Sequence, residues 1–244
     1  MAFWGDYHTH SVFSHGKGSV EENVLAARAA GLKAIAITDH GVCGFPKNLQ
    51  PADIPVLKAE IERCRAAYPD MTVLAGVESN LISDKGDIDM PEGAEEMFDL
   101  IICGYHAVRI PDSPRQFFKL WVPNSLPTKN TARRRARNTD ALIRAMRDHR
   151  VGVIAHPMRQ FPCDLKALGE AAKEYGVYLE LNSKSCSLTT DELEIIVSTG
   201  CGLVCSSDAH SPDRVGDFSA AGLVDAAGLD RSVIANWEAF PKFR

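Results

Sequence analysis

The chain has 244 residues, a length that fits one large domain or two small ones and that α/β barrels often fill as a single unit. Hydrophobic residues make up 45% and charged residues 24%, which is the balance of a folded globular protein and argues against extensive disorder. The net charge of −5, without a basic tail, argues against a broad nucleic-acid-binding surface and leaves small anionic substrates open.

Hydropathy and the pattern of cysteines indicate in which compartment of the cell the protein is expected. No apolar run approaches the ~20 residues needed to span a bilayer, and the opening MAFWGDYHTH lacks the basic and apolar regions of a signal peptide. The seven cysteines form no C-x-x-C pair, which is typical of reduced thiols. Cys103 and Cys205 lie in apolar runs and are expected to be buried small side chains. We therefore expect a cytoplasmic protein without membrane contact.

Short apolar, β-branched runs alternate with helical patterns and predict seven buried parallel strands. The predicted strands cover residues 3–8, 34–38, 73–78, 99–106, 151–156, 177–182 and 202–208. Three of the intervening helices have capping signals, at Ser19 with Glu22, at Asp164, and at Thr189 with Glu192. Seven βα units in order predict one α/β domain spanning residues 1–244, built as a closed or nearly closed parallel barrel; a doubly wound open sheet is the alternative.

Two connections are long, at residues 41–54 and 107–130. The second is a loop insertion with four prolines and the aromatic residues Phe117, Phe118 and Trp121, and a structureless loop of this length is usually functional. Two roles are open for this connection. It forms a lid or a dimer contact, or it is an insertion that packs on the outside of the domain.

A run of arginines follows this insertion. On a helix, Arg133, Arg137 and Arg144 would share one face, with Arg134 beside them. We favour a solvated face over an anion-binding rim, although guanidinium groups bind phosphate well.

Polar side chains stand just past the predicted strand ends, and seven of the eight histidines are among them or in the loop that follows the first strand. The residues with metal-binding side chains are His8, His10, His15, His40, Glu78, His106, His156, Asp208 and His210. Strand ends of one polarity open onto one face of a parallel barrel, so these side chains should converge there. Imidazole and carboxylate groups are ligands for Zn, Mn or Fe.

Nine candidate ligands are too many for a single tetrahedral site with an open position, so two or three divalent ions are implied. Paired metal ions separated by roughly 3.5–4 Å are a recurring device for hydrolysing phosphate esters, because they polarise the phosphoryl group and lower the pKa of water. The sequence therefore predicts a metal-dependent phosphoric ester hydrolase.

Six motifs in order, DYHTH, AITDHG, GVES, GYH, IAHP and SSDAH, resemble those of the PHP (polymerase and histidinol phosphatase) family of metal-dependent phosphoesterases, from about residue 5 to residue 217. The closest likeness is to the small stand-alone bacterial phosphatases. This resemblance implies a distorted (β/α)7 TIM-like barrel and a trinuclear site.

The resemblance also implies how the ligands divide. The first ion would be held by His8, His10, Glu78 and Asp208, the second by Glu78, His106 and His156, and the third by His15, His40 and His210. His15 departs from the family pattern, because its loop often carries Asp at another spacing. The number of bound ions, two or three, therefore depends on whether the third site forms.

The predicted reaction is hydrolysis of a small phosphorylated substrate by a metal-bound hydroxide, with Glu78 and Asp208 at its centre. Asp39 is a candidate to protonate the leaving group, although a partner that orients a ligand imidazole, or a turn residue, is favoured. Candidate phosphate contacts are Lys17, Arg159, Lys184 and Arg214, and Asn182 is expected to fix a loop or a ligand.

Three other functions remain open. An amidohydrolase also begins with H-x-H, but it needs a bridging lysine and no lysine ends a predicted strand here. A metal-loaded regulatory module without activity is disfavoured because all nine ligand positions hold competent residues. A nuclease or nucleotide phosphatase is the runner-up, since Arg133 to Arg137 and the nearby aromatic residues could bind a nucleotide or a short strand.

Overall fold

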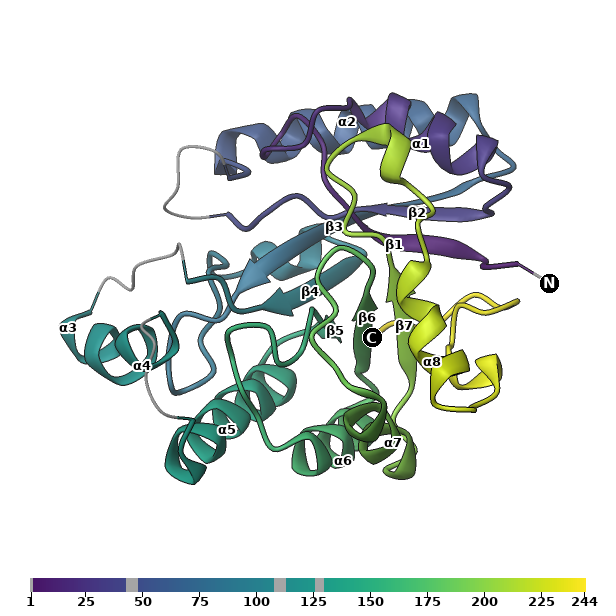
Figure 1. The fold of residues 1–244 in the computed structure, drawn as a ribbon. Coiled ribbons are helices and arrows are strands. Elements are labelled where there is room, and N and C mark those ends of the chain that lie inside the picture. The colour runs from purple at the N-terminus through teal and green to yellow at the C-terminus, as the bar shows by residue number, and fades with distance from the viewer. Residues whose placement is uncertain (1, 43–47, 108–112, 126–129) are drawn as a thin grey trace.

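The computed structural model describes residues 2–42, 48–107, 113–125 and 130–244, and shows a single α/β domain (Figure 1). Seven parallel strands are hydrogen-bonded to one another in chain order. They are β1 (Gly5–Thr9), β2 (Ala34–Ile37), β3 (Thr72–Asn80), β4 (Leu100–Gly104), β5 (Val151–Ile154), β6 (Tyr178–Asn182) and β7 (Leu203–Ser206). All seven predicted strands are therefore confirmed, most with ends shifted by one or two residues.

Helices follow six of the seven strands and cover the outside of the sheet, whereas β3 and β4 are connected through a 3-10 turn at Ala94–Met97 (Figure 1). They are α1 (Val20–Ala29), α2 (Ile54–Ala67), α3 (Pro114–Gln116), α4 (Val122–Ser125), α5 (Ala132–Asp148), α6 (Leu165–Tyr175), α7 (Thr190–Ser198) and α8 (Gly222–Ala226). The predicted caps form: Ser19 and Thr189 make complete capping boxes with Glu22 and Glu192, and the Asp164 side chain accepts from two amide groups of α6.

The barrel is nearly closed, as predicted, and the open-sheet alternative is wrong. β1 and β7 meet through a parallel bridge between Thr9 and Ala209. The amide of His10 donates to the carbonyl of Ala209 across 2.8 Å, and the amide of Ala209 donates to the carbonyl of His8 across 3.3 Å. This seam lies at the C-terminal ends of both strands, next to the residues predicted to bind metal.

Aromatic side chains fill the opposite end of the barrel. Tyr7 is buried, and its ring contacts Phe240 and Phe243 edge to face, with centroids 5.9 and 5.0 Å away. Phe243 also packs on Tyr178, at the N-terminal end of β6. The C-terminal segment thus closes the end of the barrel away from the histidines.

The long connection after β4 differs from the prediction of a structureless loop. Residues 114–125 are helical, with a π-helical turn at Phe117–Trp121 between α3 and α4. The rings of Phe117 and Trp121 stack at 4.9 Å, and the Trp121 indole donates to the carbonyl of Ala107 across 2.6 Å. Aromatic packing and the Trp121 bond to residue 107 give this connection its structure.

The arginine-rich segment is a helix, α5, as predicted. Arg134 donates to the Asn124 side chain and Arg137 to the carbonyl of Lys119, across 2.9 and 2.6 Å. These two guanidinium groups hold the segment of residues 113–125, while Arg133 is exposed.

The six described cysteines are free thiols, and Cys103 and Cys205 are buried as expected; Cys43 lies outside the described residues. None of the helices in the described part of the chain is long and apolar enough to cross a membrane.

Candidate metal centre

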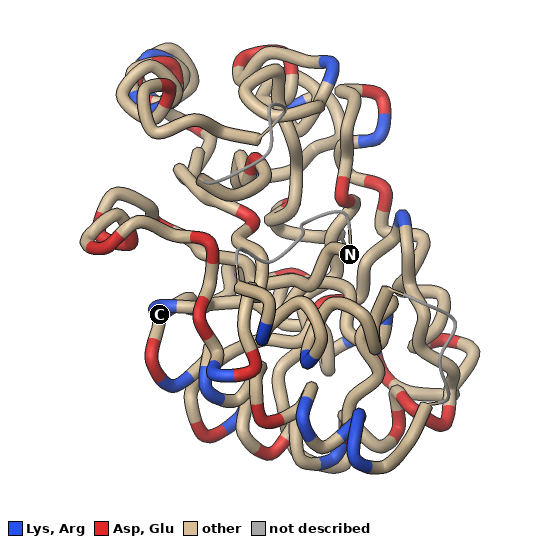
Figure 2. Tube along the Cα trace, turned by 90° about the vertical axis from the view of Figure 1, so that its left-hand side faces the viewer, with Lys and Arg blue, Asp and Glu red and all other residues tan. Residues whose placement is uncertain are grey.

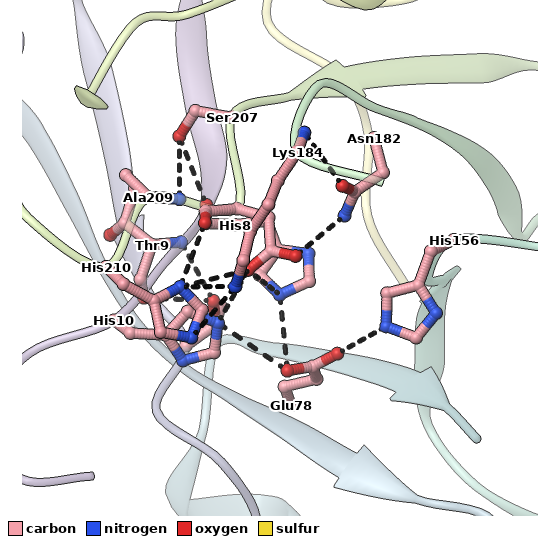
Figure 3. A network of polar contacts seen from close by, with 12 residues as sticks. His8, Thr9, His10, Glu78, His156, Asn182, Lys184, Ser207, Ala209 and His210 are labelled. Atoms are coloured by element: carbon pink, nitrogen blue, oxygen red, sulfur yellow. Dashed lines mark hydrogen bonds and ion pairs between the residues drawn. The ribbon is translucent and has the colours of Figure 1, made fainter. Parts of the chain in front are cut away.

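The strand ends bring the predicted ligands together around the carboxylate of Glu78, near the end of β3 (Figure 3). Glu78 is buried, and five imidazoles lie within 4 Å of its oxygens. Nitrogen-to-oxygen distances are 2.9 Å for His40, 3.0 Å for His156, 3.3 Å for His8, 3.4 Å for His106 and 3.6 Å for His10. The ends of β1, β2, β4 and β5 therefore meet at a carboxylate of β3.

Asp208 supplies a second buried carboxylate on the other side of His8 and His10. Its Oδ1 lies 3.3 Å from His10 Nε2, 3.8 Å from His8 Nε2 and 3.3 Å from His210 Nδ1. The pair of carboxylates thus flanks the two histidines of the H-x-H motif.

Several buried polar atoms at this centre have no hydrogen-bond partner among the described residues. They include His8 Nε2, His10 Nε2 and Glu78 Oε2, which face one another. Buried polar atoms are almost always satisfied, because leaving one unpaired costs about 1–3 kcal/mol. A divalent cation would satisfy all three, so the residues present fit a metal ion.

The described histidines and acidic residues form three overlapping groups whose ligand atoms lie within 4.8 Å of one another. The groups are His8, His10 and Glu78; His40, Glu78 and His106; and His10, His40 and His210. The first and third resemble the predicted sets, but the second contains His40 where the prediction has His156. His15 lies beside the third group, with Nε2 2.8 Å from His210 Nε2 and its ring stacked on His40 at 4.5 Å.

Electrostatics favour positive charge between the carboxylates. Burial alone would raise the pKa of Glu78, but His40, His8 and His106 hold it well below its usual value. Burial alone would lower the pKa of His8, yet Glu180 and Glu78 hold it well above. His10 differs, because burial and His40 keep its pKa well below the usual value. The ionised Glu78 carboxylate beside the neutral His10 imidazole is a ligand pair that divalent metals prefer.

Glu180 of β6 orients candidate ligands and was not among the residues predicted from the sequence. It is buried, its Oε1 accepts from His8 Nδ1 across 2.7 Å, and its Oε2 accepts from the amide of His156 across 2.8 Å. The first bond leaves the Nε2 lone pair of His8 directed at Glu78, an arrangement typical of metal-binding histidines. The signal was available, since Glu180 stands two residues before Asn182 in an otherwise apolar strand.

Asn80 plays the same part for His106 and was also missed. Its Oδ1 accepts from His106 Nδ1 across 2.6 Å, and its own amide nitrogen donates to Asp89 across 2.7 Å. Asp89 also accepts from the Asn80 main chain across 2.6 Å, so both buried side chains are fixed.

The backbone adopts unusual conformations at two of the candidate ligands. His156 has φ of 31° and Asp208 has φ of 52°, a region that costs non-glycine residues free energy. Gly104 makes room for the first of them: a Cβ there would lie 2.8 Å from Cε1 of the His156 ring.

Among the described residues, the hydrogen bonds of the Asp39 side chain go to serines of the loop after β1. Its buried carboxylate accepts from the amide and hydroxyl of Ser11 across 2.7 and 2.5 Å and from the hydroxyl of Ser14 across 2.6 Å. It therefore fixes the loop that carries His15, in agreement with the turn-residue alternative. A part for Asp39 in protonating the leaving group stays a prediction.

The four residues predicted to contact phosphate differ in whether they face the metal centre. Lys184 reaches into the centre, with Nζ 3.3 Å from Asp208 Oδ1 (Figure 3). Burial lowers the pKa of the His106 imidazole to about 3, with smaller effects in the same direction from His156, His40 and Arg159. Lys17 is exposed, although its amide donates to the carbonyl of His210 across 2.9 Å. Arg214 pairs with Asp217 instead.

Asn182 fixes both a loop and a candidate ligand, as predicted. Its Nδ2 donates to Asp208 across 3.2 Å and to Glu180 across 3.0 Å, and its Oδ1 accepts from the amides of Lys184 and Ser185.

The face at the C-terminal ends of the strands carries charges of both signs. Figure 2 shows Lys and Arg interspersed with Asp and Glu around this side of the molecule.

The PHP domain model matches residues 6–184. The chain belongs to the PHP family. The resemblance of the six motifs is thereby confirmed, and so is the predicted enzyme class, a phosphoric ester hydrolase.

Two relatives in the PHP family are named "Probable phosphatase". One, from Aeromonas hydrophila, is 30% identical over 230 residues, which cover 89% of this chain and 82% of the relative. The other, from Caldanaerobacter subterraneus, is 31% identical over 244 residues, which cover 95% and 86%.

A solved PHP structure has the same fold. Histidinol phosphate phosphatase from Lactococcus lactis, in complex with zinc, L-histidinol and phosphate, superposes with a TM-score of 0.63 at 18% identity and covers 92% of this chain and 94% of its own.

Proposed function

We propose that this PHP protein hydrolyses phosphomonoesters of small metabolites at a centre that holds at least two divalent ions. The observation that carries the proposal is the set of buried atoms of His8, His10 and Glu78 that have no hydrogen-bond partner among the described residues. When bound, the ions would polarise the phosphoryl group and lower the pKa of water for attack on phosphorus. Zn, Mn and Fe all suit this mixture of nitrogen and oxygen ligands.

Some of these side chains would hold the metal ions, and others orient the side chains that hold them. His8, His10, Glu78 and Asp208 would hold one ion, and Glu78 with His106, His156 and His40 would hold another. Glu180 and Asn80 fix the ring orientation of His8 and His106, so that the Nε2 atoms of both face Glu78.

Lys184 and Arg159 support a monoester rather than a diester as substrate. A phosphomonoester carries a charge of about −1.5 to −2 near neutral pH, and a diester carries one. The exposed Lys184 contacts Asp208 of the centre, and the half-buried Arg159 follows His156 by three residues in another loop. Two cations in addition to the metal ions match the charge of a terminal phosphate.

The test is hydrolysis by purified full-length chain supplied with Mn²⁺ or Zn²⁺. We expect metal-dependent turnover of p-nitrophenyl phosphate, slower turnover of bis-p-nitrophenyl phosphate, and loss of both with EDTA. Glu78→Gln should lower activity at least about 100-fold, because even residues that only support metal ligands are worth about 10–100-fold. Glu174→Gln, on the exposed face of α6, is the matched control. Absence of metal-dependent turnover of either substrate, with Glu78→Gln unchanged, contradicts the proposal.

Substrate class is tested with a panel of histidinol phosphate, sugar phosphates, nucleoside bisphosphates and short oligonucleotides. We expect the small monoesters to have the highest kcat/KM. A higher value for oligonucleotides would favour the nuclease alternative.

A further inference from the structure

The helical connection after β4, consisting of residues 113–125, is attached to the chain beside the candidate ligand His106. The connection lies at the edge of the domain, next to the start of α5 (Figure 1). The Trp121 indole of its π-helical turn donates to the carbonyl of Ala107 across 2.6 Å. Because Ala107 is the next residue after His106, this bond holds the main chain directly beside a candidate metal ligand.

A second contact reaches the other side of this ligand. Tyr105, the residue before His106, is buried, and its ring stacks on Phe161 with centroids 4.6 Å apart. The Tyr105 hydroxyl lies 3.2 Å from the hydroxyl of Ser125, at the end of α4. The residues before and after His106 therefore both form a hydrogen bond to the helical connection.

His106 lies just beyond the end of the sheet. The last residue of β4 is Gly104, which pairs with Asn80 and whose carbonyl accepts from the amide of Leu81 across 2.8 Å. Two residues later the main chain has left the parallel ladder, so the regular hydrogen bonds between strands no longer hold it. The bond from Trp121 supplies a main-chain contact at the point where the ladder ends.

The helical connection is also attached to the loop after β3, the strand that carries Glu78. Gln116 Oε1 accepts from the amide of Asp84 across 2.9 Å, and Gln116 Nε2 donates to the Asp84 carboxylate across 2.8 Å. Lys119 Nζ lies 3.6 Å from the same carboxylate. The connection thus joins the chain after β3 to the chain after β4, whose side chains Glu78 and His106 lie 3.4 Å apart.

We propose that Trp121, together with Ser125, positions His106 for metal binding, so that the helical connection is a supporting part of the metal centre. The inference rests on the proposed function, which assigns His106 to a metal ion. Asn80 fixes the rotation of the imidazole, whereas Trp121 fixes the main chain from which the imidazole extends. Side chains of a binding site must be held within about 0.5 Å of the productive geometry, so both bonds are required.

The experiment compares Trp121→Phe with wild type. Phenylalanine keeps an aromatic ring beside Phe117 but removes the N–H donor. Trp237→Phe is the matched control, since Trp237 packs on Phe3, ahead of β1 and away from the histidines. Mn²⁺ binding is measured without substrate by equilibrium dialysis and mass spectrometry. Hydrogen exchange is followed at the amides of residues 105–107, and urea denaturation measures the free energy of unfolding.

We expect Trp121→Phe to weaken the binding of one Mn²⁺ ion per chain about tenfold, the lower end of the range for groups that support metal ligands. Amide exchange at residues 105–107 should rise. Turnover of p-nitrophenyl phosphate should fall at limiting metal and recover with excess Mn²⁺, because the imidazole is still present. Trp237→Phe should bind Mn²⁺ as wild type does, even where its free energy of unfolding falls.

Ser125→Ala is the second variant, which keeps the inference testable if Trp121→Phe does not fold. It removes the partner of the Tyr105 hydroxyl by a smaller change and should weaken the binding of the same ion. Unchanged Mn²⁺ binding in the folded variants, or an equal loss of affinity in Trp237→Phe, would overturn the inference. Wild-type turnover with Mn²⁺ would then leave the proposed function standing, whereas wild type that binds neither Mn²⁺ nor Zn²⁺ contradicts both.

Discussion

Glu180 shows how a single buried side chain can organise a metal centre without belonging to it. One carboxylate oxygen accepts from His8 and the other from the main chain of His156, so it joins β1, β5 and β6 behind the candidate ligands. Because burial removes competition from water, the orientation of these bonds is fixed before any ion binds.

Glu180→Gln is expected to weaken metal binding about 10–100-fold, because the amide removes the charge that favours the His8 tautomer. The midpoint of a Mn²⁺ titration of activity checks this, and excess metal should restore most of the turnover. Glu174→Gln again serves as the control. An unchanged midpoint would show that Glu180 has only a structural role.

Gly104→Ala is expected to lower activity about 10- to 100-fold, since a misplacement of about 1 Å at a reacting centre has effects of this size. The new Cβ would lie 2.8 Å from Cε1 of His156 and push this ring from its position 3.0 Å from Glu78. The measurement is kcat on p-nitrophenyl phosphate. Gly222→Ala is the control, because a Cβ there meets no atom within 4 Å. Equal activity of the two variants would contradict the positioning of His156 by Gly104.

At the scale of elements, α5 is the support for the helical connection after β4. Asn138 of α5 is buried and donates to the Asn124 side chain and to the carbonyl of Pro162, both across 2.9 Å. The amphipathic sequence of α5 therefore combines a packed face with a polar face that holds the preceding segment.

Asn138→Ala is expected to lower the free energy of unfolding by about 1–3 kcal/mol, because the Asn124 side chain and the carbonyl of Pro162 lose their buried partner. Urea denaturation measures this change, and amide hydrogen exchange should rise within residues 113–125. Arg133→Ala, at an exposed position of the same helix, should stay within about 0.5 kcal/mol of wild type. Equal effects of the two substitutions would refute this role of Asn138.

At the scale of the whole molecule, the two ends of the barrel have different tasks. The C-terminal ends of the strands carry the polar centre. The N-terminal ends are closed by Tyr7, Phe240 and Phe243, which bury apolar surface. Stability and chemistry can therefore be altered separately.

Phe243→Ala is expected to lower the free energy of unfolding by about 2–3 kcal/mol, at or below the range for fully buried phenylalanines because Phe243 is only partly buried. Below the melting transition, kcat should stay near the wild-type value. Phe118→Ala, at a side chain that is 69% exposed, is the control. A loss of kcat without a loss of stability would contradict the separation of the two ends.

The sequence by itself determined the order of strands and helices and most of the centre. Its apolar runs, capping residues and six motifs predicted seven βα units and placed histidines and carboxylates at strand ends, because these signals are local. A parallel barrel then requires the strand ends to share one face. The convergence of His8, His40, Glu78, His156 and Asp208 follows from that rule.

Only the tertiary structure decided which side chains meet. The bonds of Glu180 and Asn80 to histidines, the turn role of Asp39 and the contact between Lys184 and His210 join residues 26 to 172 positions apart or depend on loop geometry. The pairing of such groups depends on strand register and side-chain rotamers, which no local pattern encodes. The helical turns at residues 114–125 were missed for a similar reason, because aromatic stacking and a tertiary hydrogen bond outweigh the prolines there.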